Sequence, residues 1–370
     1  MSSSPLVVVF APDSFKGSLS SVEVALALSR GWARARPADE LVHAPLADGG
    51  EGTLRAIELA GGWRSQQVRV HDPIGRSVVA RWLRSDDLER GAIELAEASG
   101  LSRLSPVERD PIRASTRGTG EVIRAALDAG VRQIVLGIGG SATTDGGTGI
   151  LAALGAVAER DSDAPVDLTG LDPRLAETTL RIACDVTNPL LGPTGAAATY
   201  GPQKGATPEQ VADLNRRLAG WADRLERATG RRERDTPGAG AAGGVGFGLL
   251  CLRDRFRSLE LVPGVDLVAE ETGLDAKLAR ADIVLTGEGR IDAQTAFGKT
   301  ALGVARRAQV ARVRCIAVGG GVEAAGIPAL AGCGAEVVPV HQAPISLETA
   351  IAAGAAPLID CAERIARSIG

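Results

Sequence analysis

The sequence predicts an α/β protein of two lobes, and three observations lead to that prediction. A chain of 370 residues is longer than a single hydrophobic core usually supports. Short apolar runs alternate with helical patterns at both ends of the chain, which is typical of a parallel sheet covered by helices. The stretch between them begins with strands that directly follow one another, which favours a separate mixed domain.

The two chain ends are expected to form one doubly wound parallel sheet of the flavodoxin or Rossmann type. A strand without polar positions indicates burial on both faces, and a Ser20 and Glu23 capping box marks the first helix. The expected elements are strands at 6–11, 41–47, 282–286, 314–318 and 336–340, with helices at 20–35, 51–59 and after each of the later strands. Five strands make a sheet of ordinary size, so residues 1–62 and 280–370 are predicted to form one discontinuous domain.

Residues 63–279 are expected to form an inserted mixed α/β domain with a glycine-rich loop. The pattern predicts a meander of strands at 67–71, 77–83 and 92–97, then a helix at 119–129, strands at 133–137 and 180–184, and a helix at 208–229. Residues 231–236 are expected to form an exposed, charged turn. A ligand cleft is expected between the two domains.

Composition argues for small-molecule chemistry inside a cell. The net charge is −4 with acids and bases interspersed, so no basic surface for nucleic acid or for a membrane is indicated. The five cysteines have neither disulfide-framework nor zinc-site spacing, which favours a reducing compartment. Because no export signal or membrane-spanning run is visible, we expect a cytoplasmic protein.

Charged residues follow the predicted strands at the edge where open α/β sheets bind ligands. The candidates are Asp13 and Lys16 after the first strand, Asp48 and Glu51 after the second, Glu288, Arg290 and Asp292 after the third, Gly319 to Gly321 after the fourth, and His341 after the fifth. A structural lobe needs turn residues at this edge, but not acids and bases in successive loops. The pattern therefore predicts a catalytic site.

A glycine-rich segment at 137–149 directly follows a predicted strand of the inserted domain. Its glycines allow close backbone approach to phosphate oxygens, and its hydroxyl groups add donors. The candidate ligand-binding residues are Gly139, Gly140, Ser141, Thr143, Asp145, Gly146 and Gly147. Residues 137–142 also fit a dinucleotide-binding pattern, although the continuation delays the helix that this pattern should open.

Other loops leave alternatives open. Asp185 follows a strand in a Pro- and Gly-rich loop and could bind magnesium, accept a proton, or cap a turn. Lys299 could reach a phosphate or be solvated, but a true P-loop is absent because Ala293 stands where a glycine is needed. Lys204 lies on a tight turn and could likewise have either a functional role or none. No Ser-His-Asp or Cys-His arrangement is visible.

Seven motifs occur in order between residues 11 and 300. The three most specific are Ala11-Pro12-Asp13-Ser14-Phe15-Lys16-Gly17-Ser18, Leu46-Ala47-Asp48-Gly49-Gly50-Glu51-Gly52-Thr53 and Thr286-Gly287-Glu288-Gly289-Arg290-Ile291-Asp292, and the supporting ones lie at 139–149, 184–191, 201–205 and 294–299. Together they resemble the bacterial glycerate kinases of the glycerate 2-kinase type. The resemblance implies transfer of the ATP γ-phosphoryl group to D-glycerate with Mg2+, the 2-phosphoglycerate product being favoured. It also implies two α/β lobes around a cleft.

Roles for individual residues follow from the chemistry of phosphoryl transfer, which depends on positioning and charge neutralisation. Lys16 and Arg290 are candidates for the glycerate carboxylate or the transferring phosphoryl group, and Lys299 for a nucleotide phosphate. The metal ligands or the general base are sought among Asp48, Asp185 and Asp292, with Asp13, Glu51 and Glu288 completing the catalytic set.

Two other classes of function compete with this interpretation. The dinucleotide-like pattern at 137–142 would fit an NAD-linked oxidoreductase of a small hydroxy acid. A small-ligand-binding protein also uses two α/β lobes around a cleft. A homodimer is left open, because interface helices and core helices have the same apolar pattern.

Overall fold

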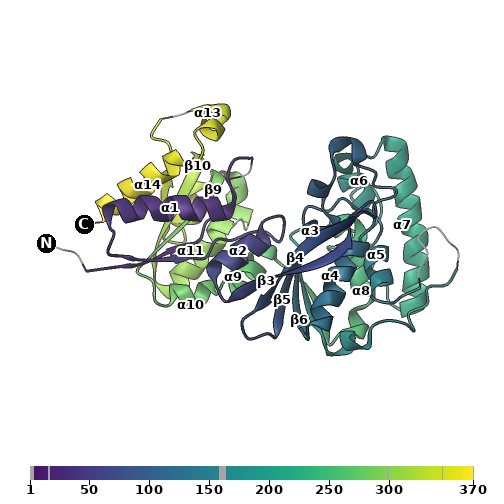
Figure 1. Ribbon diagram of the computed structural model, residues 1–370. Helices are drawn as coiled ribbons and strands as arrows, with labels where there is room; N and C mark the ends of the chain where they lie inside the picture. The colour runs from purple at the N-terminus through teal and green to yellow at the C-terminus, as the bar shows by residue number, and fades with distance from the viewer. Residues whose placement is uncertain (1–3, 16, 158–163, 298–299, 344, 370) are drawn as a thin grey trace. The chain divides into compact units, whose positions relative to one another are not determined.

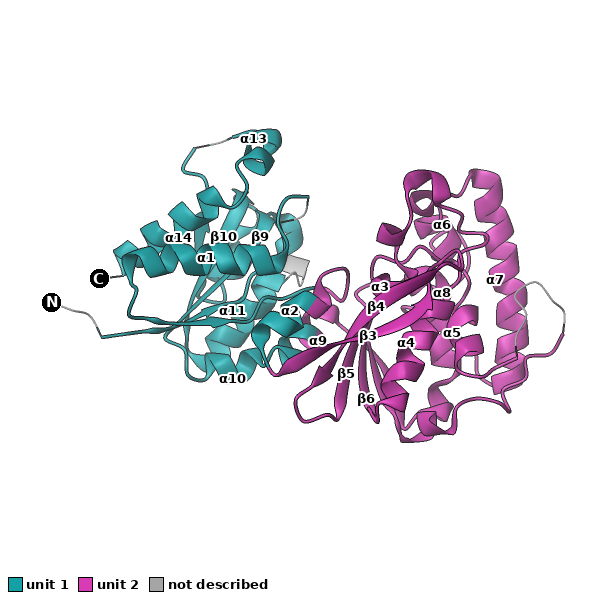
Figure 2. Cartoon of the chain, in the orientation of Figure 1, with its two compact units in different colours: residues 1–47, 55–61, 268–370 teal, residues 48–54, 62–267 magenta. Residues whose placement is uncertain are grey.

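The computed structural model describes residues 4–15, 17–157, 164–297, 300–343 and 345–369 (Figure 1). The chain divides into two compact units (Figure 2). Unit 1 contains residues 1–47, 55–61 and 268–370, and unit 2 contains residues 48–54 and 62–267. Residues 48–54 and residue 62 therefore lie in unit 2 and residues 268–279 in unit 1, opposite to their predicted domains.

Unit 1 is built on a five-stranded parallel sheet with the order β11-β10-β9-β1-β2. Numbered along the unit, this order is 2-1-3-4-5, that of flavodoxin-like sheets. The strands are β1 (Val7–Phe10), β2 (Glu40–His43), β9 (Ile283–Ile291), β10 (Arg314–Val322) and β11 (Glu336–Pro339). Val8 in β1 pairs with Ile283 in β9, so distant parts of the chain share one sheet. The predicted α/β class is confirmed.

The helices of unit 1 are α1 (Ser21–Ala35), α10 (Leu274–Leu278), η6 (Ala293–Phe297), α11 (Thr300–Ala311), α12 (Ile327–Ala331), α13 (Leu347–Ala352) and α14 (Ala356–Ser368). Two more, α2 (Thr53–Ala60) and α9 (Gly264–Glu271), begin in unit 2 and end in unit 1. The predicted Ser20 and Glu23 capping box is present at the start of α1. Helices α1 and α14 lie side by side (Figure 1), and the Cβ position of Gly31 would be 2.0 Å from the Ile359 carbonyl oxygen. Only glycine permits this approach.

Unit 2 contains a six-stranded mixed sheet with the order β3-β4-β5-β6-β7-β8. The strands are β3 (Trp63–His71), β4 (Ser77–Ser85), β5 (Arg90–Glu94), β6 (Gln133–Gly137), β7 (Thr179–Ala183) and β8 (Ser258–Val262). The first three pair antiparallel, as the predicted meander requires, and β5 to β8 pair parallel. The carboxyl ends of β5 to β8 therefore meet at one edge.

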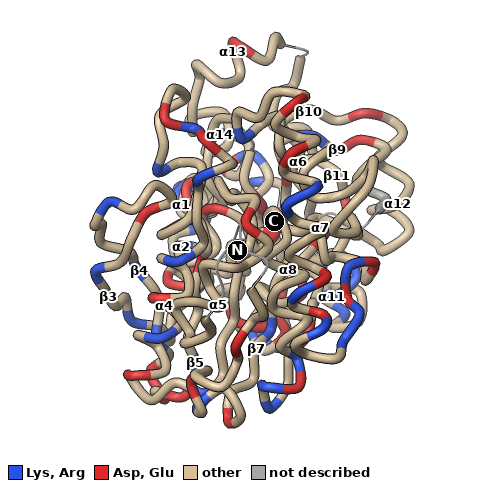
Figure 3. Tube along the Cα trace, turned by 90° about the vertical axis from the view of Figure 1, so that its right-hand side faces the viewer, with Lys and Arg blue, Asp and Glu red and all other residues tan. Residues whose placement is uncertain are grey.

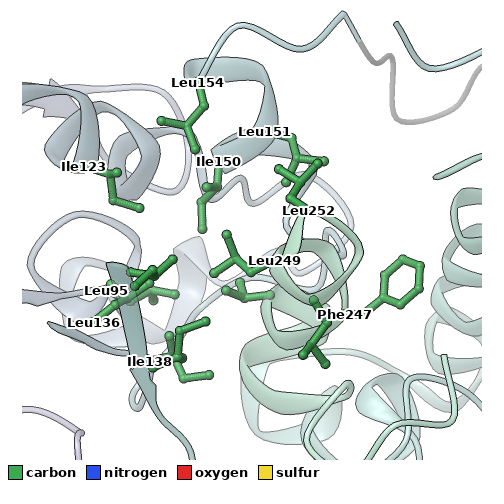
Figure 4. Close-up of a cluster of buried hydrophobic side chains, with 14 of the residues drawn as sticks. Leu95, Ile123, Leu136, Ile138, Ile150, Leu151, Leu154, Phe247, Leu249 and Leu252 are labelled. Atoms are coloured by element: carbon green, nitrogen blue, oxygen red, sulfur yellow. The ribbon is translucent and has the colours of Figure 1, made fainter. Parts of the chain in front are cut away.

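The helices of unit 2 include a long amphipathic helix and a glycine-rich one. They are α3 (Ala96–Ser99), η1 (Leu101–Arg103), η2 (Pro106–Glu108), α4 (Arg117–Asp128), α5 (Thr148–Ala153), η3 (Pro173–Glu177), α6 (Ala196–Tyr200), η4 (Pro202–Lys204), α7 (Pro208–Thr229), α8 (Ala241–Cys251) and η5 (Arg253–Arg255). Figure 4 shows Leu249 of α8 among buried side chains that include Leu136 of β6 and Ile150 of α5. Helix α8 thus belongs to the main core of the unit.

Several local predictions were wrong. Residues 287–291 and 319–321 were expected in loops, but they continue β9 and β10, which stay paired as far as Ile291 and Val322. The segment 231–236 is not a simple exposed turn, because Arg234 bonds the Glu226 carboxylate at 2.7 Å and the Arg234 carbonyl accepts from the Leu190 backbone. The segment therefore supports the loop that follows Asp185.

Lys and Arg residues are interspersed with Asp and Glu residues along the chain (Figure 3). Within the described ranges, no helix is long and apolar enough to cross a membrane. Neither observation adds a ligand class to those already considered.

Candidate active site

In unit 1 the polar residues gather where β1 and β9 end, the point at which the strand order reverses. Ligands bind at such switch points because neighbouring connections leave in opposite directions. The Asp13 amide donates to the Gly287 carbonyl at 2.8 Å, which fixes the loop after β1 against β9. The Thr300 hydroxyl donates to the Asp13 carboxylate at 2.5 Å. Asp13 is thus held at the first turn of α11.

Glu288 and Asp292 are linked through one threonine. The Thr295 hydroxyl donates to Glu288 Oε1 at 2.7 Å and accepts the Asp292 amide at 3.1 Å. Asp292 Oδ1 accepts the Gln294 amide at 2.8 Å, which is the capping geometry of a short helical turn. Glu288 is buried, whereas Asp292 is partly accessible. The arrangement places both acids beside η6, with Asp292 nearer to solvent.

Arg290 lies two residues before Asp292 and is mostly exposed. Its guanidinium pairs with Glu323, and its Nε lies 4.0 Å from the Asp292 carboxylate. The hydrogen bond with Glu323 raises the pKa of Arg290 further above its usual range. Glu323, just beyond β10, was not predicted; an acid after the Gly319 to Gly321 run was the available signal. Lys16 and Lys299 lie outside the described residues.

In unit 2 the Asp48 and Asp185 loops meet at Gly264. The Gly264 amide donates to Asp185 Oδ1 at 2.8 Å. A Cβ at Gly264 would lie 2.1 Å from the Asp48 carbonyl oxygen and 3.0 Å from Asp185 Oδ2. Both aspartates are exposed. Two separated loops therefore bring two carboxylates to the carboxyl ends of β7 and β8.

The first half of the glycine-rich loop packs against the Asp48 loop. The Gly139 amide donates to the Gly49 carbonyl at 3.2 Å, and a Cβ at Gly139 would lie 2.5 Å from the Gly50 Cα. Gly140 has φ +70° and is exposed, with only one atom, the Ala96 Cβ at 3.6 Å, near its Cβ position. Glu51 is exposed on the same 48–54 segment. Gly139 to Ser141 is consequently the part of the loop beside the acidic residues.

The second half of the loop faces inward. Asp145 is 3% exposed and its carboxylate accepts from the Thr116 amide and hydroxyl, both at 2.8 Å, and from the Gly147 and Gly149 amides. The Trp221 indole donates to the Gly146 carbonyl at 3.0 Å, and a Cβ at Gly146 would lie 2.5 Å from the Trp221 ring. Thr143 is fully buried. Thr143, Asp145, Gly146 and Gly147 therefore shape the loop from within.

Two buried ionisable groups support this edge of unit 2. Glu94, at the end of β5, accepts the Leu54 amide at 2.6 Å, and burial raises the pKa of its carboxyl to about 7. Lys204 donates to the Ser141 hydroxyl and to the Thr143 carbonyl. Glu94 was not predicted as a site residue. The sequence feature that could have revealed it is a single acidic residue inside the apolar run at 92–96.

The three candidate metal ligands are divided between the two units. Asp48 and Asp185 belong to unit 2 and Asp292 to unit 1. Throughout the described ranges, no group of three or more His, Cys, Asp and Glu side chains is arranged to hold a metal ion. Mg2+ commonly takes only one or two carboxylates and completes its shell with water and phosphate oxygens. The Asp48 and Asp185 pair fits that pattern.

Acidic and hydroxyl side chains at the carboxyl ends of parallel strands in both units define the protein as an α/β enzyme acting on small molecules. The profile of the "Glycerate kinase family" matches residues 8–370. The chain therefore belongs to the glycerate kinase family, as its motifs indicated, and it is a phosphotransferase with an alcohol group as acceptor.

Individual relatives agree with this assignment. The chain is 45% identical to a glycerate kinase of Haemophilus influenzae, over 84% of this chain and 85% of that protein. It is 41% identical to the glycerate 2-kinase of Escherichia coli K12, over 82% of both chains. A crystal structure of a protein assigned as glycerate kinase 2 from Salmonella typhimurium LT2 aligns with a TM-score of 0.83 at 40% identity, covering 99% of this chain and 98% of that one.

Proposed function

We propose that this chain is an ATP-dependent glycerate kinase, which transfers the γ-phosphoryl group of ATP to the 2-hydroxyl group of D-glycerate in the presence of Mg2+. The observation that carries the proposal is the grouping in unit 2 of Asp48, Asp185 and the Gly139 to Ser141 backbone at one sheet edge. The names of the relatives support both the acceptor and the 2-position.

The residues of unit 2 fit a magnesium–nucleotide complex. Asp48 and Asp185 offer two exposed carboxylates, the number that Mg2+ takes when phosphates supply further ligands. Bound there, Mg2+ would neutralise negative charge on the transferring phosphoryl group. Gly139 and Gly140 offer backbone without side chains in the way, and Ser141 adds a hydroxyl group.

The residues of unit 1 fit the acceptor and proton-transfer roles. Arg290 is an exposed cation that suits a carboxylate or a phosphoryl oxygen. Asp292 is held by its Gln294 cap while its remaining oxygen lies 4.0 Å from Arg290 Nε. We assign Asp292 as the leading candidate for the base that accepts the hydroxyl proton. Glu288 supports it through Thr295, and Asp13 bonds Thr300 at the start of α11. Lys16 remains a candidate for binding the glycerate carboxylate or the transferring phosphoryl group, and Lys299 for binding a nucleotide phosphate.

The competing NAD-linked function has less support. A dinucleotide fingerprint needs a helix that opens directly from its glycines. Here α5 begins at Thr148, well beyond Ala142, and Gly139 approaches the backbone of Gly50. The glycines of the pattern are thus required by packing between two protein segments.

A coupled assay with ATP, D-glycerate and Mg2+ tests the proposal, and phosphorus NMR of the product identifies the hydroxyl that is phosphorylated. Asp185→Asn should raise the Mg2+ concentration needed for half-maximal rate, while Asp86→Asn, at an exposed position on the β4–β5 turn, should not. Binding of NAD with no turnover of ATP and glycerate would refute the kinase assignment.

A further inference from the structure

Lys204 ends η4 in the turn at 201–205 and is buried to 2% exposure. The chain reverses immediately after it at Gly205, which has φ +96° and approaches Arg109. The Lys204 side chain reaches the glycine-rich loop across 63 positions of sequence. Its Nζ donates to the Ser141 hydroxyl oxygen at 2.8 Å and to the Thr143 carbonyl at 2.5 Å.

This ammonium group is buried at a cost. Both hydrogen bonds that the structure gives for Lys204 go to uncharged oxygens, and taking an ion out of water is unfavourable unless an opposite charge compensates it. Burial lowers the pKa of Lys204 to about 7, and the charge of Asp145 opposes that shift. An apolar side chain would fill the space without this penalty. A buried cation behind a ligand-binding loop is therefore a candidate functional group.

The hydrogen bond fixes which way the Ser141 hydroxyl group points. A serine hydroxyl has one proton and two lone pairs. In the direction of the bond that the structure gives, the protonated Lys204 donates and the Ser141 oxygen accepts, so the Ser141 proton is directed elsewhere. Ser141 retains a small exposed area beside the exposed Gly140. The bond thus makes Ser141 a donor and places positive charge behind it.

The same bond orients the peptide that follows. The Thr143 carbonyl points to Lys204 in the interior, and the fully buried Thr143 anchors the loop beyond Ser141. Asp145 holds the next residues by accepting the Gly147 and Gly149 amides. The stretch from Gly139 to Ser141 precedes these anchored residues, and Gly139 packs against the Asp48 loop.

We propose that Lys204 is a positioning residue, which fixes the Ser141 hydroxyl as a hydrogen-bond donor to a substrate oxyanion bound at Gly139 to Ser141. The oxyanion is a phosphate group of the nucleotide or the carboxylate of the acceptor, and the inference rests on the proposed kinase function. Lys204 acts through Ser141 and touches no substrate itself.

A double-mutant cycle tests the proposal with Lys204→Met, Ser141→Ala and the double variant. Each single variant should lower kcat/KM by about 10- to 100-fold, the usual scale for losing a donor or its supporting group. The double variant should be little worse than either single one, because both remove the same donor. A rise confined to the KM of ATP assigns the oxyanion as phosphate, and a rise confined to the KM of glycerate assigns it as carboxylate.

Lys277→Met is the matched control. Lys277 is partly buried and likewise donates to two backbone carbonyls, those of His43 and Ala60, in unit 1. Its replacement should lower the melting temperature while leaving kcat/KM unchanged. If Lys204→Met behaves like Lys277→Met, or if the effects of Lys204→Met and Ser141→Ala multiply, the positioning role is refuted.

Binding of inorganic phosphate provides a readout that needs no turnover. Phosphate should raise the melting temperature of the wild-type chain, and Ser141→Ala, which keeps the Lys204 bond to the Thr143 carbonyl, should abolish that rise. This arm decides the question if Lys204→Met fails to fold. Wild-type protein without kinase activity would refute the proposed function alone, whereas unchanged phosphate binding and unchanged kinetics in Ser141→Ala would refute the inference alone.

Discussion

Replacing Glu94 by glutamine should make the stability of unit 2 much less dependent on pH. Glu94 is 5% exposed, and burial raises its pKa to about 7; the hydrogen bond from the Leu54 amide opposes this shift, and the nearby charges of Glu97 and Glu51 add smaller increases. The unfolded chain titrates this group near 4.5, so the folded state binds more protons between pH 4.5 and 7. The contribution of Glu94 to stability is therefore complete below pH 4.5 and is lost as the pH rises through 7.

The size of the effect follows from the shift. A difference from 4.5 to about 7 implies a loss of about 2 to 3 kcal/mol between pH 5 and pH 8. Glutamine can still accept the Leu54 amide through its carbonyl oxygen but carries no charge. The free energy of unfolding of Glu94→Gln, relative to wild type, should consequently increase by about that amount over this range.

Urea unfolding followed by tryptophan fluorescence measures this difference, because three of the four tryptophans, Trp63, Trp82 and Trp221, lie in unit 2. Lys204 also titrates in this range, with a pKa of about 7, but it is present in both proteins, so its contribution cancels in the difference between Glu94→Gln and wild type. Glu89→Gln, at an exposed position before β5, is the control and should show no such change. If the free energies of unfolding of Glu94→Gln and wild type differ by the same amount at pH 5 and at pH 8, the proposed effect of Glu94 is refuted.

Three further substitutions test the site. Asp292→Asn keeps the Gln294 cap but removes the charge, so turnover should fall by about 10²-fold with an unchanged melting temperature, and near-normal turnover would remove Asp292 from the catalytic set. Gly146→Val should destabilise the protein by about 2 to 4 kcal/mol, because its Cβ would overlap the Trp221 ring and its φ is positive. Gly140→Ala, which also has a positive φ but meets no such overlap, should cost only about 1 kcal/mol. Equal melting temperatures of the two variants would contradict this prediction. Ser141→Thr should retain the donor and most of the activity measured for wild type, which kinetics would check.

The sequence was most informative where a local signal was complete. The capping box of α1 and the glycine that ends α7 could be predicted, because each signal lies within one turn of the helix end that it marks. The alternation of strands and helices at both chain ends predicted the parallel sheet of unit 1 for the same reason.

The secondary-structure predictions were wrong or missing where the role of a glycine depends on residues far away in the sequence. The glycines of α8 suggested no helix, yet Gly243 and Gly244 let this helix approach Thr143 and Gly146 closely. Gly319 to Gly321 suggested a loop, but the pairing of β10 with β9 extends that strand. The partner of each glycine is far away in sequence and leaves no local trace.

The candidate site shows the same division. Asp48, Asp185 and the exposed part of the glycine-rich loop follow strand ends, which a pattern of apolar runs reveals. That Gly146 faces Trp221, 75 positions away, depends on the packing of α7. Burial of Glu94 likewise depends on the 48–54 segment crossing the end of β5.

The pairing of β1 with β9 also affects how the chain is made. The Thr286 hydroxyl bonds the Ala11 carbonyl across 275 positions, so the first strand lacks its central neighbour while most of the chain is still being synthesised. At about 5 to 20 residues per second, that interval lasts roughly 15 to 55 seconds. Residues 62–267 are contiguous and can complete their own sheet during this time. The edge of β1 that pairs with β9 therefore keeps its backbone hydrogen-bonding groups unpaired throughout this interval. We expect β1 to be the segment of the nascent chain that chaperones must protect from pairing with other chains.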